Sequence, residues 1–269
     1  MLHLSCLSSN DVADVAPFPT SYIFAIFGIP YSVFGTSSIP IWLAAPKLGE
    51  GGWTSRHPAP NIFTVIALLD YGSGNLRSAH NALLKTGADV RIARAPAEMR
   101  DAQAVVLPGV GAFDDCMNAL QKQELLEASR DFIRTGKPFL GICVGYQALF
   151  ERSEEFNSCA AGLGVFKGSV VRFPAKPGLK IPQIGWNQLD IVQRDCPLFR
   201  GVESGSYVYF VHSFFPKPED SSIIATNTEY GENFASAIWK DNVYATQFHP
   251  EKSQRTGLQL LKNFVELAK

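Results

Sequence analysis

The sequence predicts an α/β fold: an open, mostly parallel sheet with helices on both faces. The first observation behind this fold class is the pattern after Val65, where short apolar runs alternate with longer amphipathic stretches. Parallel strands need crossover connections, which are usually helices, so this alternation is typical of a sheet covered on both sides. The second observation is that the later half of the chain is richer in candidate strands. We expect these to add antiparallel strands to the sheet.

The elements of the first half follow in order. The apolar run 65–69 predicts a buried strand, and the amphipathic stretch 75–86 predicts a helix that ends at Gly87. The remaining elements are two strands at 88–93 and 104–107, a helical stretch at about 112–135 (continuous or broken in its middle), and a strand at 138–142.

The second half is predicted to contain several strands and one closing helix. The strands are expected at 165–173, 188–192, 207–211, 223–226, 234–239 and 243–248. Asp241-Asn242 is a candidate tight turn between the last two. The closing helix is expected at about 253–267, with Leu258, Leu261 and Val265 buried.

Composition limits the class of function. The chain has 269 residues, of which 46% are hydrophobic and 18% charged, and its formal net charge is -1. No basic block is present, so we expect neither a nucleic acid nor a membrane as partner. The five cysteines are odd in number and no two are spaced C-x-x-C, which disfavours a zinc site and suits a reducing cytoplasm. We therefore expect a cytoplasmic protein without a metal or a cofactor.

Residues 1–63 differ from the rest of the chain. They contain no Lys or Arg up to Pro46, and their apolar stretch 22–45 is interrupted by two prolines. They therefore match neither a membrane helix of about 20 apolar residues nor a secretory signal or transit peptide. We expect residues 1–63 to be a poorly ordered extension or an over-extended gene start, the latter favoured over a functional extension, and residues 64–269 to form one domain.

The stretch most informative about chemistry is Gly141-Ile142-Cys143-Val144-Gly145. An apolar strand precedes Cys143, a helical pattern follows it, and glycine stands two positions away on either side. This is the nucleophile-elbow arrangement with cysteine in place of serine, a sharp turn that needs small neighbours. The turn also places the thiol at a helix N-terminus, which favours the thiolate. For this motif alone, the alternative is a buried core cysteine.

A second motif, Gln247-Phe248-His249-Pro250-Glu251, favours the catalytic interpretation. His249 directly follows an apolar strand, and open α/β sheets bind ligands at the carboxyl ends of their strands. Glu251 is placed to accept the other N–H of the imidazole and so to fix its tautomer. Of the five histidines, only His249 has a carboxylate two positions on. We predict that Cys143, His249 and Glu251 act as nucleophile, base and orienting carboxylate.

Attack on an amide also needs hydrogen-bond donors for the oxyanion. The backbone N–H of Val144, directly after the nucleophile, is one candidate. The loop Pro108-Gly109-Val110-Gly111, between a predicted strand and a predicted helix, offers another. A loop of this composition is by itself more often a simple turn.

Together these motifs resemble those of the class I glutamine amidotransferases, which carry G-x-C-x-G-x-Q and H-P-E in this order after a glycine-rich loop. The resemblance covers residues 65–269 and none of 1–63. Within that class, the chain is similar to the glutaminase subunits of imidazole glycerol phosphate synthases. That closer likeness rests on Asp70-Tyr71-Gly72-Ser73-Gly74-Asn75-Leu76, Pro108-Gly109-Val110-Gly111-Ala112-Phe113, Ile184-Gly185-Trp186-Asn187, Tyr209-Phe210-Val211-His212-Ser213 and His249-Pro250-Glu251-Lys252-Ser253.

The resemblance implies a fold and a reaction. The fold is the flavodoxin-like fold of this class with added antiparallel strands. The reaction is hydrolysis of L-glutamine to glutamate and ammonia through a thioester on Cys143. His249 would act as general base and acid, and Glu251 would hold the imidazole ring. The activity implied is that of a glutaminase, a hydrolase that would serve as part of a lyase complex.

The resemblance also implies contacts with the substrate and with a partner. Gln147 would contact the amino-acid end of glutamine, and the oxyanion hole would comprise Val110, Gly111 and Val144. The partner would be a (β/α)8-barrel synthase subunit in a heterodimer, which uses the ammonia to form imidazole glycerol phosphate in histidine biosynthesis. The residues implied to face that partner are Asn75, Trp186 and Lys252.

Three positions depart from the usual family pattern. Val144 and Tyr146 stand where leucine and methionine are usual, and Phe214 where tyrosine is common. Position 144 acts through its backbone, so we expect little effect there, whereas the other two can alter how glutamine or the partner packs.

Four alternative functions fit the sequence less well. The glutaminase of another amidotransferase, such as that of anthranilate or pyridoxal phosphate synthesis, is disfavoured by the 71–76 motif and the Trp186-Asn187 pair. A cysteine peptidase of the same fold commonly has histidine directly after the cysteine, where this chain has Val144. A dinucleotide-binding module is disfavoured because Arg77 stands in place of the third glycine. A non-catalytic scaffold subunit would be expected to have lost the cysteine or the histidine.

Overall fold

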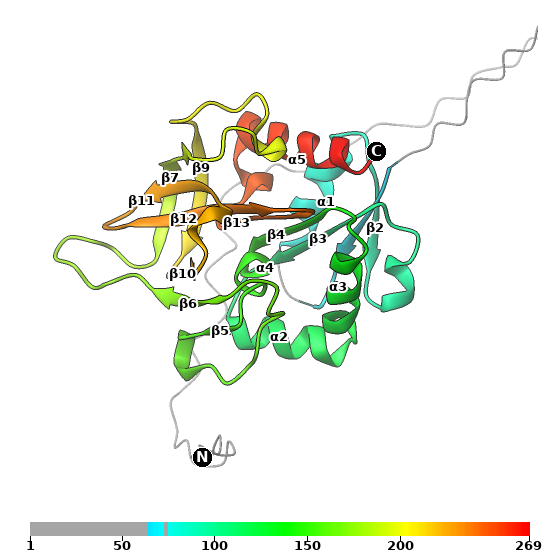
Figure 1. The fold of residues 1–269 in the computed structure, drawn as a ribbon, viewed down its shortest axis with the longest axis horizontal. Helices are drawn as coiled ribbons and strands as arrows, with labels where there is room; N and C mark the ends of the chain where they lie inside the picture. The colour runs from blue at the N-terminus through cyan, green and yellow to red at the C-terminus, as the bar shows by residue number, and fades with distance from the viewer. Residues whose placement is uncertain (1–63, 73–74) are drawn as a thin grey trace, which may run out of the picture. The chain divides into compact units, whose positions relative to one another are not determined.

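The computed structural model describes residues 64–72 and 75–269, with an eight-stranded sheet at their centre (Figure 1). The prediction for residues 1–63 lies outside the described residues. Across the sheet the strands are β2 (Asp89–Ala93), β1 (Val65–Leu69), β3 (Ala104–Gly109), β4 (Phe139–Cys143), β13 (Val243–Thr246), β12 (Asn233–Lys240), β11 (Ile224–Glu229) and β8 (Asp190–Ile191).

The sheet has a parallel half and an antiparallel half. The run from β2 to β13 is parallel throughout, and β12, β11 and β8 continue it with antiparallel pairing. Numbered along the chain, the parallel strands lie in the order 2-1-3-4-5, which is the flavodoxin-like order. Strands β3 and β4 are buried at every position, as expected where helices cover both faces. The predicted fold class is confirmed.

Helices cover the two faces of the sheet in pairs. Figure 1 shows α1 (Leu76–Leu84) and α5 (Gln254–Leu267) on one face, and α2 (Phe113–Lys122) and α3 (Leu125–Arg134) on the other. The stretch predicted as one or two helices is therefore broken, at Glu124, whose φ of 59° is left-handed. The predicted hairpin turn at Asp241-Asn242 is confirmed, because Lys240 pairs with Val243 across it.

The closing helix α5 differs from its prediction at one of the three positions expected to be buried. The expectation that Leu258 is buried is wrong, since this side chain is 36% exposed, whereas Leu261 and Val265 are buried. The buried face begins at Gly257, where a Cβ would overlap the Pro250 carbonyl oxygen. The glycine thus lets α5 pack directly on the turn η5 (Pro250–Lys252), which carries Glu251.

Two small sheets flank the antiparallel half, and here the sequence predictions were less accurate. One pairs β7 (Gln183–Gln188) with β9 (Tyr207–His212); the other contains β10 (Phe214–Pro218), β6 (Gly168–Arg172) and β5 (Arg152–Ser153). Of the strand predicted at 188–192, only the two-residue β8 is confirmed, whereas β7, which ends at Gln188, was not predicted. Strand β10 was not predicted because it contains two prolines, which an edge strand paired only with β6 can accommodate.

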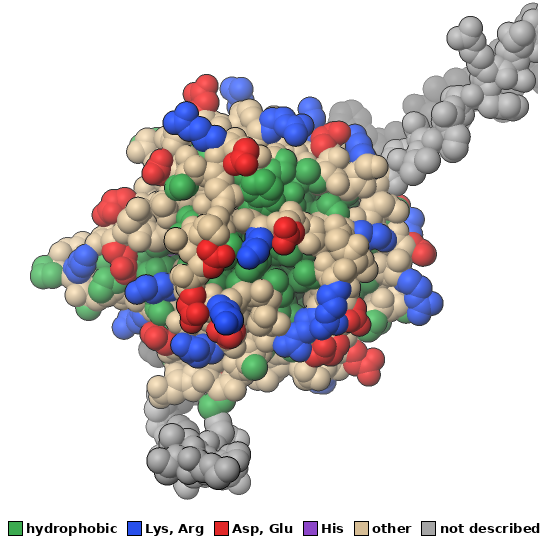
Figure 2. Space-filling view, viewed as in Figure 1, with side chains coloured by type: hydrophobic (Ala, Val, Ile, Leu, Met, Phe, Trp, Pro, Cys, Tyr) green, Lys and Arg blue, Asp and Glu red, His purple; other side chains and the backbone are tan. Residues whose placement is uncertain are grey.

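The surface of the described region carries charges of both signs. Figure 2 shows Lys, Arg, Asp and Glu side chains interspersed over one face. None of the helices in residues 64–72 and 75–269 has the length and hydropathy needed to cross a membrane.

Candidate active site

Cys143 ends β4 in a conformation that few non-glycine residues adopt. Its φ of 55° and ψ of -107° turn the chain sharply, and the single-turn helix α4 (Val144–Gln147) begins at the next residue. A Cβ on Gly145 would overlap the Leu107 carbonyl oxygen, and one on Gly141 would lie 2.6 Å from the Gly145 carbonyl oxygen. The turn therefore has the elbow geometry that the flanking glycines predict.

The helix that follows the elbow is too short to be the main source of thiolate stabilisation. Helix α4 has four residues, so few peptide dipoles align behind the Cys143 sulfur. A thiolate at Cys143 would therefore depend mainly on groups from other elements, and the residue is only 4% exposed.

The sheet brings His249 to the same edge as Cys143. Strand β13 lies beside β4 and parallel to it, with Thr246 paired to Ile142, so the chain leaves both strands at their shared carboxyl edge. The N–H of His249 donates to the Tyr209 carbonyl at 2.9 Å, which ties the residue after β13 to strand β9. The juxtaposition of the predicted nucleophile and base is thus a direct result of strand order.

His249 and Glu251 form a buried pair. The Nδ1–Oε1 distance is 2.7 Å, and the two side chains are 2% and 4% exposed. With Nδ1–H donating to the carboxylate, Nε2 is left for the sulfur; it makes no conventional hydrogen bond within the described residues. Burial alone would lower the pKa of His249, but the nearby Cys143 sulfur and then Glu251 outweigh it and raise the pKa from 6.5 to about 10. An imidazolium beside a thiol favours the thiolate.

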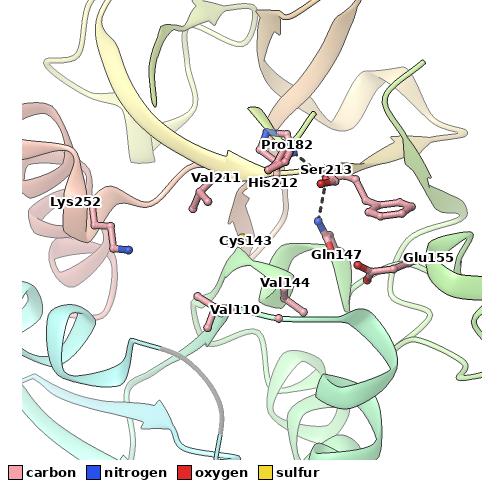
Figure 3. Close-up of a pocket in the computed structure, with 12 residues that line it drawn as sticks. Val110, Cys143, Val144, Gln147, Glu155, Pro182, Val211, His212, Ser213 and Lys252 are labelled. Atoms are coloured by element: carbon pink, nitrogen blue, oxygen red, sulfur yellow. Dashed lines mark hydrogen bonds between the residues drawn. The ribbon is translucent and has the colours of Figure 1, made fainter. Parts of the chain in front are cut away.

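A cavity of about 380 Å³ opens at Cys143 (Figure 3). Its size suits a small polar metabolite. It brings together most of the residues predicted from sequence. His249 lies beside Cys143, and Glu251 lies beside His249, but neither is part of the lining. The lining residues are Val110, Gly111, Cys143, Val144, Gln147, Glu155, Pro182, Val211, His212, Ser213, Phe214 and Lys252.

The glycine-rich loop after β3 lies against the elbow. Gly109 pairs with Cys143 across β3 and β4, which places Val110 and Gly111 at the edge of the sheet beside the sulfur. A Cβ on Gly109 would lie 2.8 Å from the Val144 Cβ, and Gly111 has a left-handed φ of 103°. The backbone at 110–111 can therefore approach the same point as the N–H of Val144, as an oxyanion hole requires.

Gln147 lies on α4 and faces the cavity with one end of its amide. Its Nε2 donates to the Phe214 carbonyl at 3.0 Å and to Gln247 Oε1 at 3.3 Å (Figure 3 shows the first of these). Both N–H groups are thus used within the protein. The polar atom left for a substrate is Oε1, an acceptor.

Glu155 lines the cavity but was not predicted from sequence. It begins the short turn η2 (Glu155–Asn157), and its Oε2 accepts the Phe113 N–H at 2.8 Å. Burial raises the pKa of this carboxyl, the Phe113 N–H lowers it, and Asp114 and Asp115 raise it. No motif or periodic pattern surrounds position 155, so only the fold reveals that it belongs to the site.

Of the residues expected at a partner face, only Lys252 also lines the cavity. Its Nζ lies 5.9 Å from the centroid of the Tyr209 ring, on the side of the site where Trp186 packs edge-on against the same ring at 6.0 Å. Trp186 is 45% exposed. Asn75 lies outside the cavity lining at the start of α1, where its Oδ1 accepts from Ser78 Oγ at 2.9 Å.

The two unusual aromatic residues occupy different environments. Tyr146 is fully buried, with its hydroxyl donating to the Ala235 carbonyl at 3.3 Å, so it affects the core behind the elbow. Phe214 lines the cavity and supplies the carbonyl that holds Gln147.

Comparison with known proteins agrees with this arrangement. The family described as "Glutamine amidotransferase class-I" matches residues 67–267. The chain belongs to this family.

Relatives of known assignment extend the comparison. Two proteins named "Imidazole glycerol phosphate synthase subunit HisH" are each 50% identical to the chain. The one from Syntrophotalea carbinolica aligns over 208 residues, 76% of this chain and 100% of that protein. The one from Geobacter sulfurreducens aligns over 209 residues, 76% of this chain and 99% of that protein. The predicted likeness to these glutaminase subunits is confirmed.

A solved structure supports the fold. "Structure of PurLQS from Thermotoga maritima" superimposes with a TM-score of 0.63 at 19% identity, covering 77% of this chain and 100% of that chain. An identity this low supports the class I amidotransferase fold alone.

Proposed function

We propose that Cys143, His249 and Glu251 hydrolyse L-glutamine, and that the chain delivers the ammonia as the glutaminase subunit of an imidazole glycerol phosphate synthase. The subunit assignment is supported by relatives that are 50% identical over their whole length. The observation that carries the mechanism is the buried His249–Glu251 pair, 2.7 Å apart, set beside a cysteine in the elbow conformation.

The reaction follows from these positions. The Cys143 thiolate attacks the carboxamide carbon, and backbone N–H groups of Val144 and of the 110–111 segment receive the oxyanion. The His249 imidazolium gives its Nε2 proton to the departing nitrogen, so ammonia leaves and a thioester remains. Neutral His249 then takes a proton from water as the water oxygen attacks the thioester. When glutamate departs, the thiolate and the imidazolium are both restored.

Two acceptors in the cavity suit the amino end of glutamine. The free Oε1 of Gln147 and the carboxylate of Glu155 line the same cavity as Cys143, and an α-ammonium group has three N–H donors to offer. Glutamine bound in this way would direct its carboxamide toward Cys143. The pair thus supports the proposed contact at Gln147 and adds Glu155 to it.

The exposed side of β7 and β9 is proposed as the docking surface for the synthase subunit. Apolar side chains are exposed there beside the cavity, with Ile184 63%, Trp186 45% and Tyr207 55% exposed. Lys252 links this surface to the cavity, because it lies over Tyr209 and also lines the site. We propose that a (β/α)8-barrel subunit covers this surface, that Asn75 contributes to the same interface, and that ammonia passes across it.

We further propose that residues 64–269 act as the complete catalytic domain, in the cytoplasm and without a cofactor. The match of the family to residues 67–267 supports this boundary.

Glutamine hydrolysis by the full chain tests the proposal. The wild type and Cys143→Ala would be compared with and without a barrel-type synthase subunit and its ribotide substrate. Glutamate formation that depends on Cys143 and rises strongly with the partner supports both the mechanism and the subunit assignment. Full activity in Cys143→Ala would overturn the mechanism, and activity that ignores the partner would overturn its role in the complex.

A further inference from the structure

Gln247 contacts the proposed nucleophile from a position that neither the elbow nor the His249–Glu251 pair explains. It lies between the end of β13 and His249, and its side chain is fully buried. Its Nε2 lies 3.7 Å from Cys143 Sγ, within the range of an N–H···S hydrogen bond. A buried amide placed against a reactive sulfur calls for a functional explanation.

The direction of this amide is fixed by a chain of hydrogen bonds that begins at the Phe214 carbonyl. A carbonyl can only accept, so it sets both of its neighbours as donors: Gln147 Nε2 at 3.0 Å and His212 Nδ1 at 2.8 Å. Burial lowers the pKa of His212 to about 3, so this ring is neutral and Nδ1 carries its hydrogen.

The orientation of the Gln147 amide in turn fixes the orientation of the Gln247 amide. Because Gln147 presents Nε2, its second N–H meets the oxygen of Gln247 at 3.3 Å. The opposite end of the Gln247 amide, its NH₂ group, must then face Cys143. Amide oxygen and nitrogen are assigned from such networks, and here every step agrees.

We propose that Gln247 is a thiolate-stabilising residue, whose side-chain N–H donates to the Cys143 sulfur and is held in that direction by Gln147 and the Phe214 carbonyl. This inference rests on the proposed role of Cys143 as nucleophile. A hydrogen bond to an anion is stronger than one to a neutral thiol, so the donor favours the ionised form.

Gln247 complements His249 and does not duplicate it. His249 gives up its proton when ammonia leaves, so its positive charge is absent during part of the cycle. The Gln247 amide cannot transfer a proton at neutral pH and keeps its donor directed at the sulfur throughout. It therefore stabilises the thiolate both at the first attack and when the thioester breaks down. Gln147 lines the substrate cavity, so the chain of hydrogen bonds also joins that cavity to the nucleophile.

Several titratable groups surround Cys143 and enter any pH profile of its reactivity. They are His249, Glu251 and Lys252 from the segment after β13, His212 from β9, Glu155 from η2 and Cys116 from α2. A variant at position 247 leaves all of them in place. A change in the profile would therefore report the lost amide.

The test is the pH dependence of Cys143 alkylation by iodoacetamide in the full chain, followed by mass spectrometry of the Cys143 peptide. Gln247→Met keeps the length of the side chain and removes the donor. We expect the pH midpoint of alkylation to rise by about one unit, and the rate at pH 6 to fall about tenfold. Gln247→Glu, of the same shape, is expected to raise the midpoint at least as far, because it sets a carboxylate against the thiolate.

Asn263→Leu is the matched control. Asn263 is a buried amide on α5 that donates to the Leu198 and Arg200 carbonyls and not to Cys143. The Asn263→Leu substitution should reduce thermal stability and leave the pH midpoint of Cys143 alkylation at its wild-type value. A buried amide that served only packing would show the same behaviour at position 247.

An unchanged midpoint in folded Gln247→Met would overturn the inference, and if that variant fails to fold, an unchanged midpoint in Gln247→Glu would do so. Alkylation needs no glutamine, so this outcome is separate from the fate of the proposed function. If Cys143→Ala is inactive and the alkylation midpoint of Gln247→Met is unchanged, the proposed mechanism stands and only the role of Gln247 is removed from it.

Discussion

The parallel and antiparallel halves of the molecule contribute different parts of one site. The parallel half supplies the reacting groups: Cys143 at the end of β4 and His249 after the neighbouring β13. The antiparallel half and its small sheets supply the wall across the cavity, with His212 and Phe214 from β9 and β10. Chemistry is thus built on rigid, fully buried strands, and recognition on shorter strands and turns.

This difference predicts that substitutions in the two halves affect different kinetic constants. Changes at the ends of the parallel strands should act on kcat, because the groups there touch the reacting atoms. Changes in the opposite wall should act on KM, because those groups meet the parts of glutamine that do not react. The predictions below challenge this division, beginning with the largest expected effect.

His249→Asn is expected to reduce kcat about 10³-fold to 10⁴-fold with little change in KM, because the leaving nitrogen loses its proton donor. Steady-state glutaminase assays in the presence of the partner would measure both constants. His80→Asn, on α1 and outside the cavity lining, serves as the control and should behave as the wild type. A kcat for His249→Asn within tenfold of the wild type would contradict the assignment.

Gly145→Ala tests how rigid the elbow is. The added Cβ would overlap the Leu107 carbonyl oxygen in a fully buried strand, so we expect a loss of about 3 kcal/mol in unfolding free energy. Gly178→Ala is the matched change in the segment between β6 and β7. Gly178 has a φ of 81°, but an added Cβ would meet no described atom within 4 Å, so about 1 kcal/mol is expected from backbone strain alone.

Urea unfolding of both glycine variants would measure the comparison. Equal losses would mean that the elbow relaxes around the new methyl group. The tight packing of β3 against α4 would then not be what holds Cys143 in its strained conformation.

The sequence predicted the two halves unequally, for a physical reason. Strands such as 65–69 and 104–109 are buried on both faces, so an apolar run alone reveals them, and motifs identify the catalytic residues at their ends. Glu155 belongs to the site only because the loop after α4 folds back over the cavity. No local pattern encodes such a contact. Gln247 was visible within the H-P-E motif region, but its role depends on Gln147, 100 positions away.

Glu155→Gln is expected to separate binding from chemistry. Removing the negative charge opposite the substrate ammonium should raise KM for glutamine about tenfold to thirtyfold and change kcat less, since a hydrogen bond to a charged group contributes about 1.5–3 kcal/mol. The amide can still accept a hydrogen bond, so the cavity keeps its shape. Glu154→Gln, at the neighbouring exposed position and outside the lining, controls for the general loss of negative charge. A fall in kcat alone would mean that this wall takes part in the chemistry.

The last prediction concerns the neutral imidazole of His212 in the antiparallel half. Its pKa in the folded chain is lowered to about 3 by burial, so between pH 6.5 and 3 the unfolded chain binds a proton that the folded chain does not. Stability must therefore fall as the pH falls, by about 1.4 kcal/mol for each unit below 6.5. His212→Asn removes this contribution while its amide can still donate to the Phe214 carbonyl.

Urea unfolding of the wild type and His212→Asn at pH 8, 6 and 5 would measure this contribution. The variant should be the less stable of the two at pH 8, because its smaller side chain loses contacts with Phe173, Phe210 and Phe234. The difference in unfolding free energy between the two proteins should then narrow as the pH is lowered. A difference in unfolding free energy that does not change with pH would mean that His212 takes up its proton in the folded protein. In that case the ring would be charged below pH 6.5. Both protonation states donate from Nδ1, so the direction of the hydrogen bonds at the Phe214 carbonyl would be unchanged.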